Sequence, residues 1–253
     1  MSNAIFWHRR DLRITDNAGL YKACQSATHV QPVFIFDTQI LNELEPTDAR
    51  VEFIHRELER LAREYAAHHI HLRVEIGNPI EIIPALAKEL KVNLVVTNRD
   101  YEPYALQRDK TIFERLQAEG IDFQGAKDHV IFEKNEVMKD DGTPYTVFTP
   151  YSRKWKERLR QQPIEVFDSL KALEKVQGLA QEPKIPTLQT LGFRPSGMEF
   201  PSTTIEDLLI QKYSDRRNFP ATPGTSKLGI HLRFGTISIR NLALRALPLN
   251  ETL

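Results

Sequence analysis

The chain has 253 residues, of which 41% are hydrophobic and 27% are charged, and its 34 basic side chains are balanced by 34 acidic ones. These proportions are typical of a folded globular protein, and the zero net charge excludes a chain that is basic throughout, so any contact with nucleic acid must come from a local patch. The single cysteine, Cys24, excludes an internal disulfide and a multi-cysteine metal site, as is usual in a reducing cytosol.

The N-terminus also lacks targeting signals. Its apolar stretch is too short for a signal peptide, and no segment approaches the ~18 consecutive apolar residues of a membrane helix. We therefore expect a cytoplasmic protein with no membrane segment.

From the N-terminus to Phe132, short strand-like runs alternate with longer helical patterns. Four strands are predicted by their apolar and β-branched residues, at 5–7, 30–36, 72–76 and 94–96. Helices are predicted after the caps Asp16-Asn17, across the apolar repeat at 51–65, after Asn78-Pro79, and from Pro103 through Leu116.

Strands separated by helices imply right-handed crossovers and a parallel sheet covered on both faces. We therefore predict a doubly wound, Rossmann-like α/β domain over residues 1–132. Ligands of such folds lie beyond the carboxyl ends of the strands, near a switch in strand order, which here places a site among residues 7–13, 36–37 and 98–104. The sequence has no GxGxxG or GxxxxGK[ST] pattern, which argues against an ordinary dinucleotide or P-loop site.

The pattern loosens after this domain. Prolines interrupt residues 133–202, which we interpret as a long connector with short helices. Helical patterns resume in residues 203–253, first around Ile205 and then from Leu228 to Leu247. About 50 residues bury too little surface to form a core of their own, so we expect this part to be the start of an incomplete helical domain.

Several motifs contain side chains that could bind a ligand, and most of them have more than one interpretation. The three arginines and the aspartate in Arg9–Arg13 could form a solvated loop or a site for an anionic or aromatic ligand. The loop Gly224–Gly229 could bind an anion through its hydroxyls and amides, or simply begin a capped helix. The basic run 151–160, which contains Trp155, fits phosphate contacts or a solvent-facing helix. His68-His69-Ile70-His71 has no acidic or cysteine partner nearby, and we predict no metal site there.

The chain closely resembles the photolyase/cryptochrome family along nearly its whole length. The motifs that carry the resemblance occur in the family's order: FWHRRDLR from Phe6, FIFD from Phe34, DARV from Asp48, NRDYEPY from Asn98, GTPYTVFTPY from Gly142, YSDRRNFP from Tyr213, GTSKLG from Gly224 and HLRFGTIS from His231. The resemblance implies an N-terminal α/β domain that holds an antenna chromophore and an all-helical domain that holds FAD.

The resemblance assigns antenna contacts to the predicted crevice. Carried over by position, these residues are Arg10, Phe36, Arg50, Asp100 and Glu102. Capping of the helix opened by Pro103 is the alternative role for Asp100 and Glu102. The sequence Glu102-Pro103-Tyr104 resembles members that use 8-hydroxy-5-deazaflavin more than members that use a reduced folate.

The resemblance also assigns residues to the flavin and to DNA. Those matching the FAD-binding segment are Tyr213, Thr225, Ser226, Lys227, Leu228 and Gly229. Gly229 replaces a serine common in the family, which removes one hydroxyl that could bind phosphate. Arg217 resembles a position at the rim where damaged DNA binds.

The implied activity is light-driven repair of cyclobutane pyrimidine dimers in ultraviolet-damaged DNA, by electron transfer from reduced FAD, so the enzyme would be a deoxyribodipyrimidine photolyase. The alternatives are a cryptochrome-type photoreceptor and a stand-alone module that binds a nucleotide-like ligand. Because the family's later helices are missing, we expect this chain alone neither to hold FAD tightly nor to repair DNA. We expect a monomer at full length; a dimer of the shortened chain, through the apolar residues of 228–247, stays open.

Overall fold

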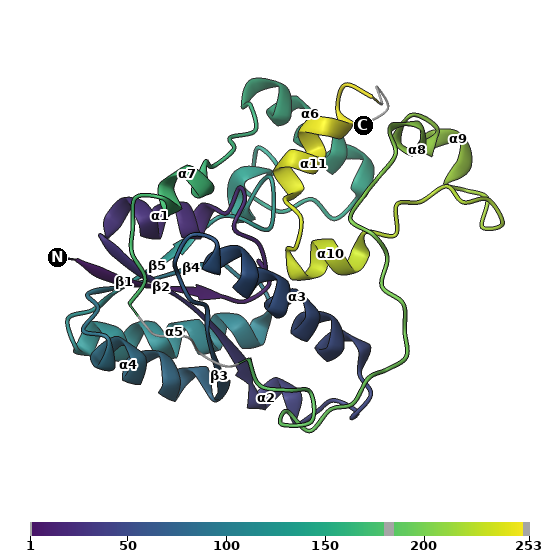
Figure 1. The fold of residues 1–253 in the computed structure, drawn as a ribbon. Coiled ribbons are helices and arrows are strands. Elements are labelled where there is room, and N and C mark those ends of the chain that lie inside the picture. The colour runs from purple at the N-terminus through teal and green to yellow at the C-terminus, as the bar shows by residue number, and fades with distance from the viewer. Residues whose placement is uncertain (1, 180–184, 250–253) are drawn as a thin grey trace.

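The computed structural model describes residues 2–179 and 185–249 (Figure 1). Its centre is a sheet of five parallel strands in the order β3-β2-β1-β4-β5, and the order switches between β1 and β4. The strands are β1 (Asn3–His8), β2 (His29–Asp37), β3 (Arg73–Gly77), β4 (Leu94–Asn98) and β5 (Asp122–Ala126). The predicted doubly wound parallel sheet is therefore confirmed.

Helices cover both faces of the sheet. On one face α1 (Ala18–Ser26) and α3 (Ala49–Ala66) pack against Ala4 and Phe6 of β1. On the other face α4 (Pro79–Glu89) and α5 (Pro103–Ala118) pack against Ile5 and Trp7. Because side chains alternate along a strand, β1 supplies both cores and is buried on each side.

The predicted helix starts are confirmed at two caps. The Asn17 side chain accepts a hydrogen bond from the Leu20 amide, and the Asn78 side chain, which precedes Pro79, accepts one from the Ile80 amide.

Strand β5 was not predicted. It is an edge strand in which Phe123 is the one large apolar side chain, so it shows neither an apolar run nor clear alternation.

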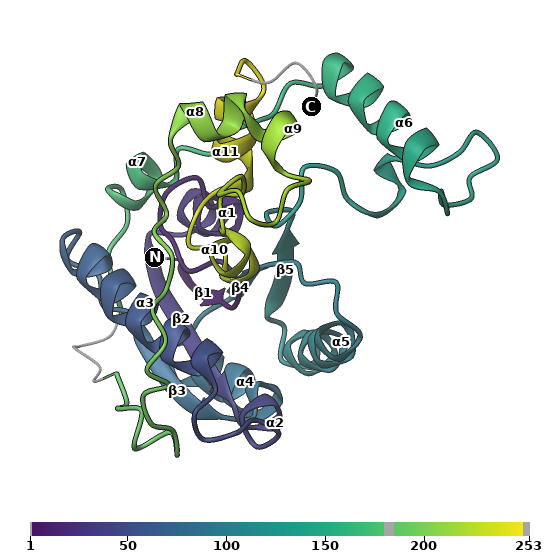
Figure 2. The ribbon, with the colours of Figure 1, turned by 90° about the vertical axis from the view of Figure 1, so that its right-hand side faces the viewer.

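Further elements surround and follow the sheet. They are α2 (Thr38–Leu41), the short 3-10 helix η1 (Lys134–Glu136), α6 (Phe148–Gln161), α7 (Ser169–Leu173), α8 (Asp207–Gln211), α9 (Tyr213–Arg216), α10 (Gly229–Phe234) and α11 (Ile239–Ala246). Figure 2 shows α6 standing away from the sheet, whereas α10 lies against the α/β part. No helix in the described ranges is long and apolar enough to cross a membrane.

The segment 228–247 differs from the prediction in two ways. It is two helices, because Gly235 has the left-handed φ of 59° and ends α10. Its apolar residues also do not form one exposed face: Leu228 and Phe234 are buried, and Phe234 belongs to the main core, while Leu232 and Leu244 are exposed. Of the apolar residues of 228–247 considered for a dimer, Leu228 and Phe234 are therefore already buried within the chain.

Buried charges fasten α11 to the α/β part. The Arg240 guanidinium lies 3.0 Å from the Asp16 carboxylate and 2.8 Å from Asp128, which also pairs with Arg13 at 2.8 Å. All four side chains are nearly inaccessible to solvent. This closed network joins the first loop of the chain to its last helix.

Candidate ligand site at the carboxyl ends of the strands

A pocket of about 220 Å³ opens where β1, β2 and β4 end, at the predicted switch in strand order. All five residues that the resemblance assigns to the antenna line it: Arg10, Phe36, Arg50, Asp100 and Glu102. They come from four separate segments, which the parallel sheet brings to one edge. Phe36 is buried in the wall, whereas Arg50 lies at the rim, where it pairs with Asp48 and stays mostly exposed.

Ion pairs link the charged residues of the pocket. Arg10 contacts Asp100 and reaches Glu102 at 3.3 Å, and Arg233 of α10 contacts Glu102 at 2.8 Å. The hydrogen bond from Arg233, followed by the charges of Arg233 and Arg10, lowers the pKa of Glu102. Burial, the largest single effect, would raise the pKa of Asp100, but the charge of Arg10, the hydrogen bond from the Glu102 amide and the charge of Arg9 together outweigh it, and the pKa is lowered. Both carboxylates are thus held ionised.

Helix capping does not account for these two carboxylates. Glu102 occupies the N-cap position of α5, but its side chain makes no cap hydrogen bond. The Asp100 carboxylate accepts from the Glu102 amide at 3.2 Å, which closes a turn ahead of the helix. The contacts with Arg10 and Arg233 are instead the main bonds that fix the Glu102 side chain.

Arginine and aromatic side chains stack around Trp7 in the pocket, an arrangement that no sequence motif predicted. The guanidinium carbons of Arg9 and Arg108 lie 4.9 and 4.8 Å from the ring centre of Trp7. Arg108 also lies 5.4 Å from the Tyr104 ring, and the Tyr104 hydroxyl donates to Asp37 at 2.7 Å. Burial and this bond raise the pKa of Tyr104. The one local signal was the spacing of Tyr104 and Arg108, which places both on the same side of a helix.

The composition of the lining defines which ligand fits. Five arginines and three carboxylates line the pocket; they are Arg9, Arg10, Arg50, Arg108 and Arg233, with Asp37, Asp100 and Glu102. Asp48 and Asp109, just outside the lining, pair with Arg50 and with Arg9 and Arg108, so the charges around the pocket balance. The aromatic rings of Trp7, Phe34, Phe36, Tyr104 and Phe234 complete the walls. A planar aromatic ligand with polar substituents suits this lining. The volume is below the ~300–1,000 Å³ of most small-molecule sites, so the pocket fits a ring system whose tail extends outside.

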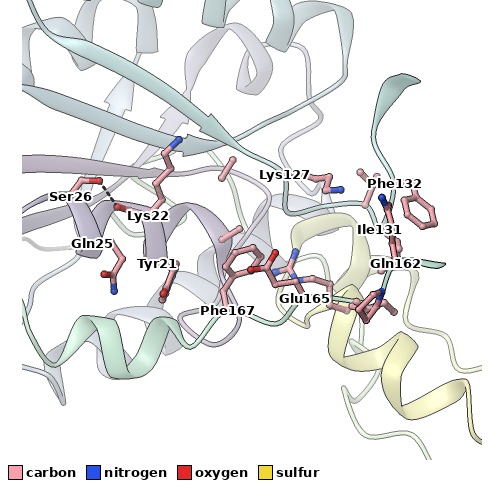
Figure 3. A pocket seen from close by; sticks show the side chains of 16 residues that line it. Tyr21, Lys22, Gln25, Ser26, Lys127, Ile131, Phe132, Gln162, Glu165 and Phe167 are labelled. Atoms are coloured by element: carbon pink, nitrogen blue, oxygen red, sulfur yellow. Dashed lines mark hydrogen bonds between the residues drawn. The ribbon is translucent and has the colours of Figure 1, made fainter. Parts of the chain in front are cut away.

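A second cavity, of about 560 Å³, lies on another side of the sheet (Figure 3). One side of α1, including Tyr21 and Lys22, forms one wall, and residues 130–132 and 162–167 form the other. The Tyr21 and Phe167 rings are 5.7 Å apart within it. None of the predicted site residues lines this cavity, so the larger of the two cavities is not the site that the sequence predicts.

The residues assigned to the flavin lie around the loop between α9 and α10. A Cβ on Gly224 would lie 2.7 Å from the Cβ of Arg216, so the loop packs directly on α9, which begins at Tyr213. The Arg217 guanidinium lies 5.4 Å from the Tyr213 ring. The structure therefore brings the predicted flavin and DNA residues to one region.

Within this loop the side chains divide into exposed and buried ones. Thr225, Ser226 and Lys227 are exposed, and in the described part of the chain neither hydroxyl has a hydrogen-bond partner. Leu228 is 2% exposed, so neither its side chain nor its backbone offers a ligand much surface. The space beside Gly229 is open. Two hydroxyls on exposed residues fit phosphate oxygens.

The histidine run and the basic helix show no ligand-like arrangement. Among residues 2–179 and 185–249, no cluster of three or more histidine, cysteine or acidic side chains is placed to hold a metal. In α6 the Trp155 ring packs edge-on against Phe132 at 5.5 Å, and its basic residues lie on the surface or at intermediate depth.

Comparison with known proteins supports one family. The family model described as DNA photolyase matches residues 4–171. A deoxyribodipyrimidine photo-lyase of Synechococcus is 34% identical over 93% of this chain and 52% of its own length. An uncharacterised 31.6 kDa protein of another Synechococcus strain is 34% identical over 94% of this chain and 87% of its own length.

Structure comparison agrees. A class III photolyase from Agrobacterium tumefaciens superposes with a TM-score of 0.79 at 24% identity, over 97% of this chain and 53% of its own. The chain thus spans about half the length of the photolyases it matches. A match over two thirds of the sequence, together with the parallel sheet and the pocket at its switch point, shows that the chain belongs to the DNA photolyase family.

Proposed function

We propose that the chain is the chromophore-binding part of a deoxyribodipyrimidine photolyase, which repairs cyclobutane pyrimidine dimers in ultraviolet-damaged DNA under light. The observation that carries the proposal is that Arg10, Phe36, Arg50, Asp100 and Glu102, assigned from sequence alone, line a single pocket. The boundaries 1–132, 133–202 and 203–253 belong to the same proposal.

The pocket is prepared for a light-absorbing ring. Trp7 is buried, and the guanidinium carbons of Arg9 and Arg108 lie within 4.9 Å of its ring, which restricts their motion, while the partly exposed Tyr104 ring offers an aromatic surface. Arg10 and Arg233 flank the ionised Glu102 at the rim, where a negatively charged substituent of the ligand would find cations. Because Glu102-Pro103-Tyr104 at this rim resembles members that use 8-hydroxy-5-deazaflavin, we propose that ligand over a reduced folate.

FAD, when bound, would supply the excited electron donor for opening the dimer. The residues of this chain that would hold it are Thr225, Ser226 and Lys227, with the Gly229 backbone, and Tyr213 beside them. Their role would be to bind phosphate through hydroxyl and amide donors, while Arg217 would contact a DNA phosphate. This loop forms one wall of a site, and we propose that the 253 residues alone neither hold FAD tightly nor repair DNA.

A binding titration tests the antenna site. Adding 8-hydroxy-5-deazariboflavin to the purified chain should raise the fluorescence anisotropy of the ligand, with 5,10-methenyltetrahydrofolate binding more weakly. Arg10→Ala should weaken binding at least tenfold. Arg99→Ala is the matched control, because Arg99 directly precedes Asp100 in the sequence but pairs with Glu133 and does not line this pocket. Equal affinity of the two variants would contradict the proposed site.

A stand-alone ligand-binding module is the second candidate. The described residues build the whole pocket, and a relative without assigned function is matched over most of its length. Absorbance of the purified chain tests both candidates: flavin bands would contradict the proposal that these residues alone do not hold FAD tightly and would exclude a module that binds only the antenna ligand, whereas an antenna band alone fits both candidates and identifies the chromophore. A photoreceptor role, a cytoplasmic location and a monomeric full-length form stay predictions.

A further inference from the structure

Helix α10 connects the pocket to the loop assigned to flavin phosphates. The helix has six residues, and it starts at Gly229, where the loop ends. Its last two residues, Arg233 and Phe234, line the pocket. At 1.5 Å per residue, the loop and the pocket rim are separated by only about 9 Å of continuous helix.

The start of α10 is tied to the loop. Leu228 is buried, and its carbonyl accepts a hydrogen bond from the Leu232 amide at 2.9 Å. Lys227, just ahead of it, has a left-handed φ of 53°. A displacement of α10 therefore changes the backbone that leads into Thr225 and Ser226.

The end of α10 is fixed to the first loop of the chain. The Phe234 carbonyl accepts from the Leu12 amide at 3.0 Å, and the Gly235 carbonyl accepts from Arg13 at 3.1 Å. Gly235 has a φ of 59°, and a Cβ there would overlap the Arg10 carbonyl. Only glycine therefore allows α10 to approach the loop that carries Arg10.

One contact on α10 can respond to a ligand. The Arg233–Glu102 pair spans 2.8 Å, and both side chains are about half exposed. An exposed ion pair contributes little to stability, so a charged group entering the pocket can compete with it. The other contacts that fix α10 are buried packing and hydrogen bonds to backbone carbonyls, one of them from the buried Arg13 side chain, and a ligand in the pocket cannot reach them.

We propose that Arg233 is a positioning residue: through its pair with Glu102 it holds α10, and α10 holds the loop at 224–229 in the conformation that presents its phosphate-binding groups. The state of the antenna pocket and the order of the flavin loop are therefore coupled. This inference rests on the proposed function for its two ligands, but the mechanical coupling is a property of the chain itself.

Hydrogen–deuterium exchange of the purified chain tests the coupling without any ligand. Arg233→Gln and Glu102→Gln should each speed exchange of the Leu232 amide, whose hydrogen bond to the Leu228 carbonyl ties α10 to the loop, by up to about fivefold, the size that one exposed ion pair allows. Arg233→Lys should restore slow exchange, because it keeps the charge. Arg115→Gln should leave exchange at Leu232 unchanged, since its pair with Glu81 has a similar length and exposure but joins α4 to α5. Unchanged exchange in Arg233→Gln would overturn the inference.

A second arm uses 8-hydroxy-5-deazariboflavin as the probe, with binding followed separately by its fluorescence. Binding should alter exchange of the Leu232 amide in the wild type, and this response should be absent in Arg233→Gln. A probe that binds without any change at Leu232 would refute the coupling. A probe that does not bind would count against the proposed antenna site, and the variants alone would then decide the inference.

Discussion

Replacing Arg240 with methionine would remove the central cation of a charge network closed to water. Arg240 is 5% exposed and donates to the carboxylates of Asp16 and Asp128 and to a backbone carbonyl at each of the same two residues. Removing one partner of a buried ion pair costs about 3–5 kcal/mol. Asp128 keeps Arg13 and the Ala18 amide as donors, so we expect a loss of about 3 kcal/mol.

Urea denaturation at pH 7, followed by circular dichroism, measures this loss. With a slope of about 2.5 kcal/mol/M, the midpoint should fall by roughly 1 M at unchanged slope. The exposed control Arg115→Met should stay within about 0.5 kcal/mol of wild type. Adding Asp16→Asn to Arg240→Met should recover part of the loss, because it removes a carboxylate left without its cation. A loss below about 1 kcal/mol would show that the network contributes little to holding α11.

The effect should depend on pH in a definite direction. Burial alone would raise the pKa of Asp128, but Arg13 and Arg240 outweigh it and hold the pKa below its ordinary value of 3.8. A lowered folded-state pKa contributes stability that is present above the unfolded value of about 3.9 and is lost as the pH falls through the folded pKa. The difference between wild type and Arg240→Met should therefore be full at pH 7 and narrow below about pH 4.

Three further predictions concern folding and reactivity. Gly235→Ala should lower the free energy of unfolding by at least about 2 kcal/mol, because it adds a clash with the Arg10 carbonyl to left-handed backbone strain. Gly142→Ala, at a left-handed position with open space around it, should lower it by about 1 kcal/mol. Equal losses in denaturation would contradict the close approach at Gly235. Tyr65→Phe should cost about 1–3 kcal/mol, since it leaves the buried His8 without its 2.7 Å partner, and a neutral result would mean that another group replaces the hydroxyl. Burial raises the pKa of the Cys24 thiol to about 12, so a disulfide reagent at pH 8 should label it only in urea; rapid labelling of the native chain would disprove its burial.

The sequence predicted what local patterns determine. Asn17 and Asn78 cap helices because a short polar side chain next to an apolar repeat satisfies the first amides, and this needs no tertiary information. The position of the pocket followed from chain order alone, because the carboxyl ends of parallel strands share one edge. Strand β5 escaped prediction because an edge strand needs little apolar surface, so its five residues carry little pattern.

Long-range contacts left no local signal. Arg240 meets Asp16 across 224 positions and Asp128 across 112, and nothing in the sequence around Arg240 distinguishes it from a surface arginine. Arg233 and Phe234 likewise join the pocket only because Gly235 lets α10 approach the first loop. Residues of this kind become identifiable only when the fold places them.

The first loop shows how one short segment serves both folding and binding. Arg9 and Arg10 line the pocket, whereas Asp11 and Arg13 are buried and bond to the chain itself. Asp11 bonds the Arg9 amide at 2.7 Å and also contacts the Asn98 side chain at the end of β4, while Arg13 reaches Asp128. The two interpretations left open for this loop are therefore both incomplete: it is not solvated, and only part of it can meet a ligand. Its buried half fixes the backbone from which the binding half projects, so the position of the binding arginines depends on residues that never touch the ligand.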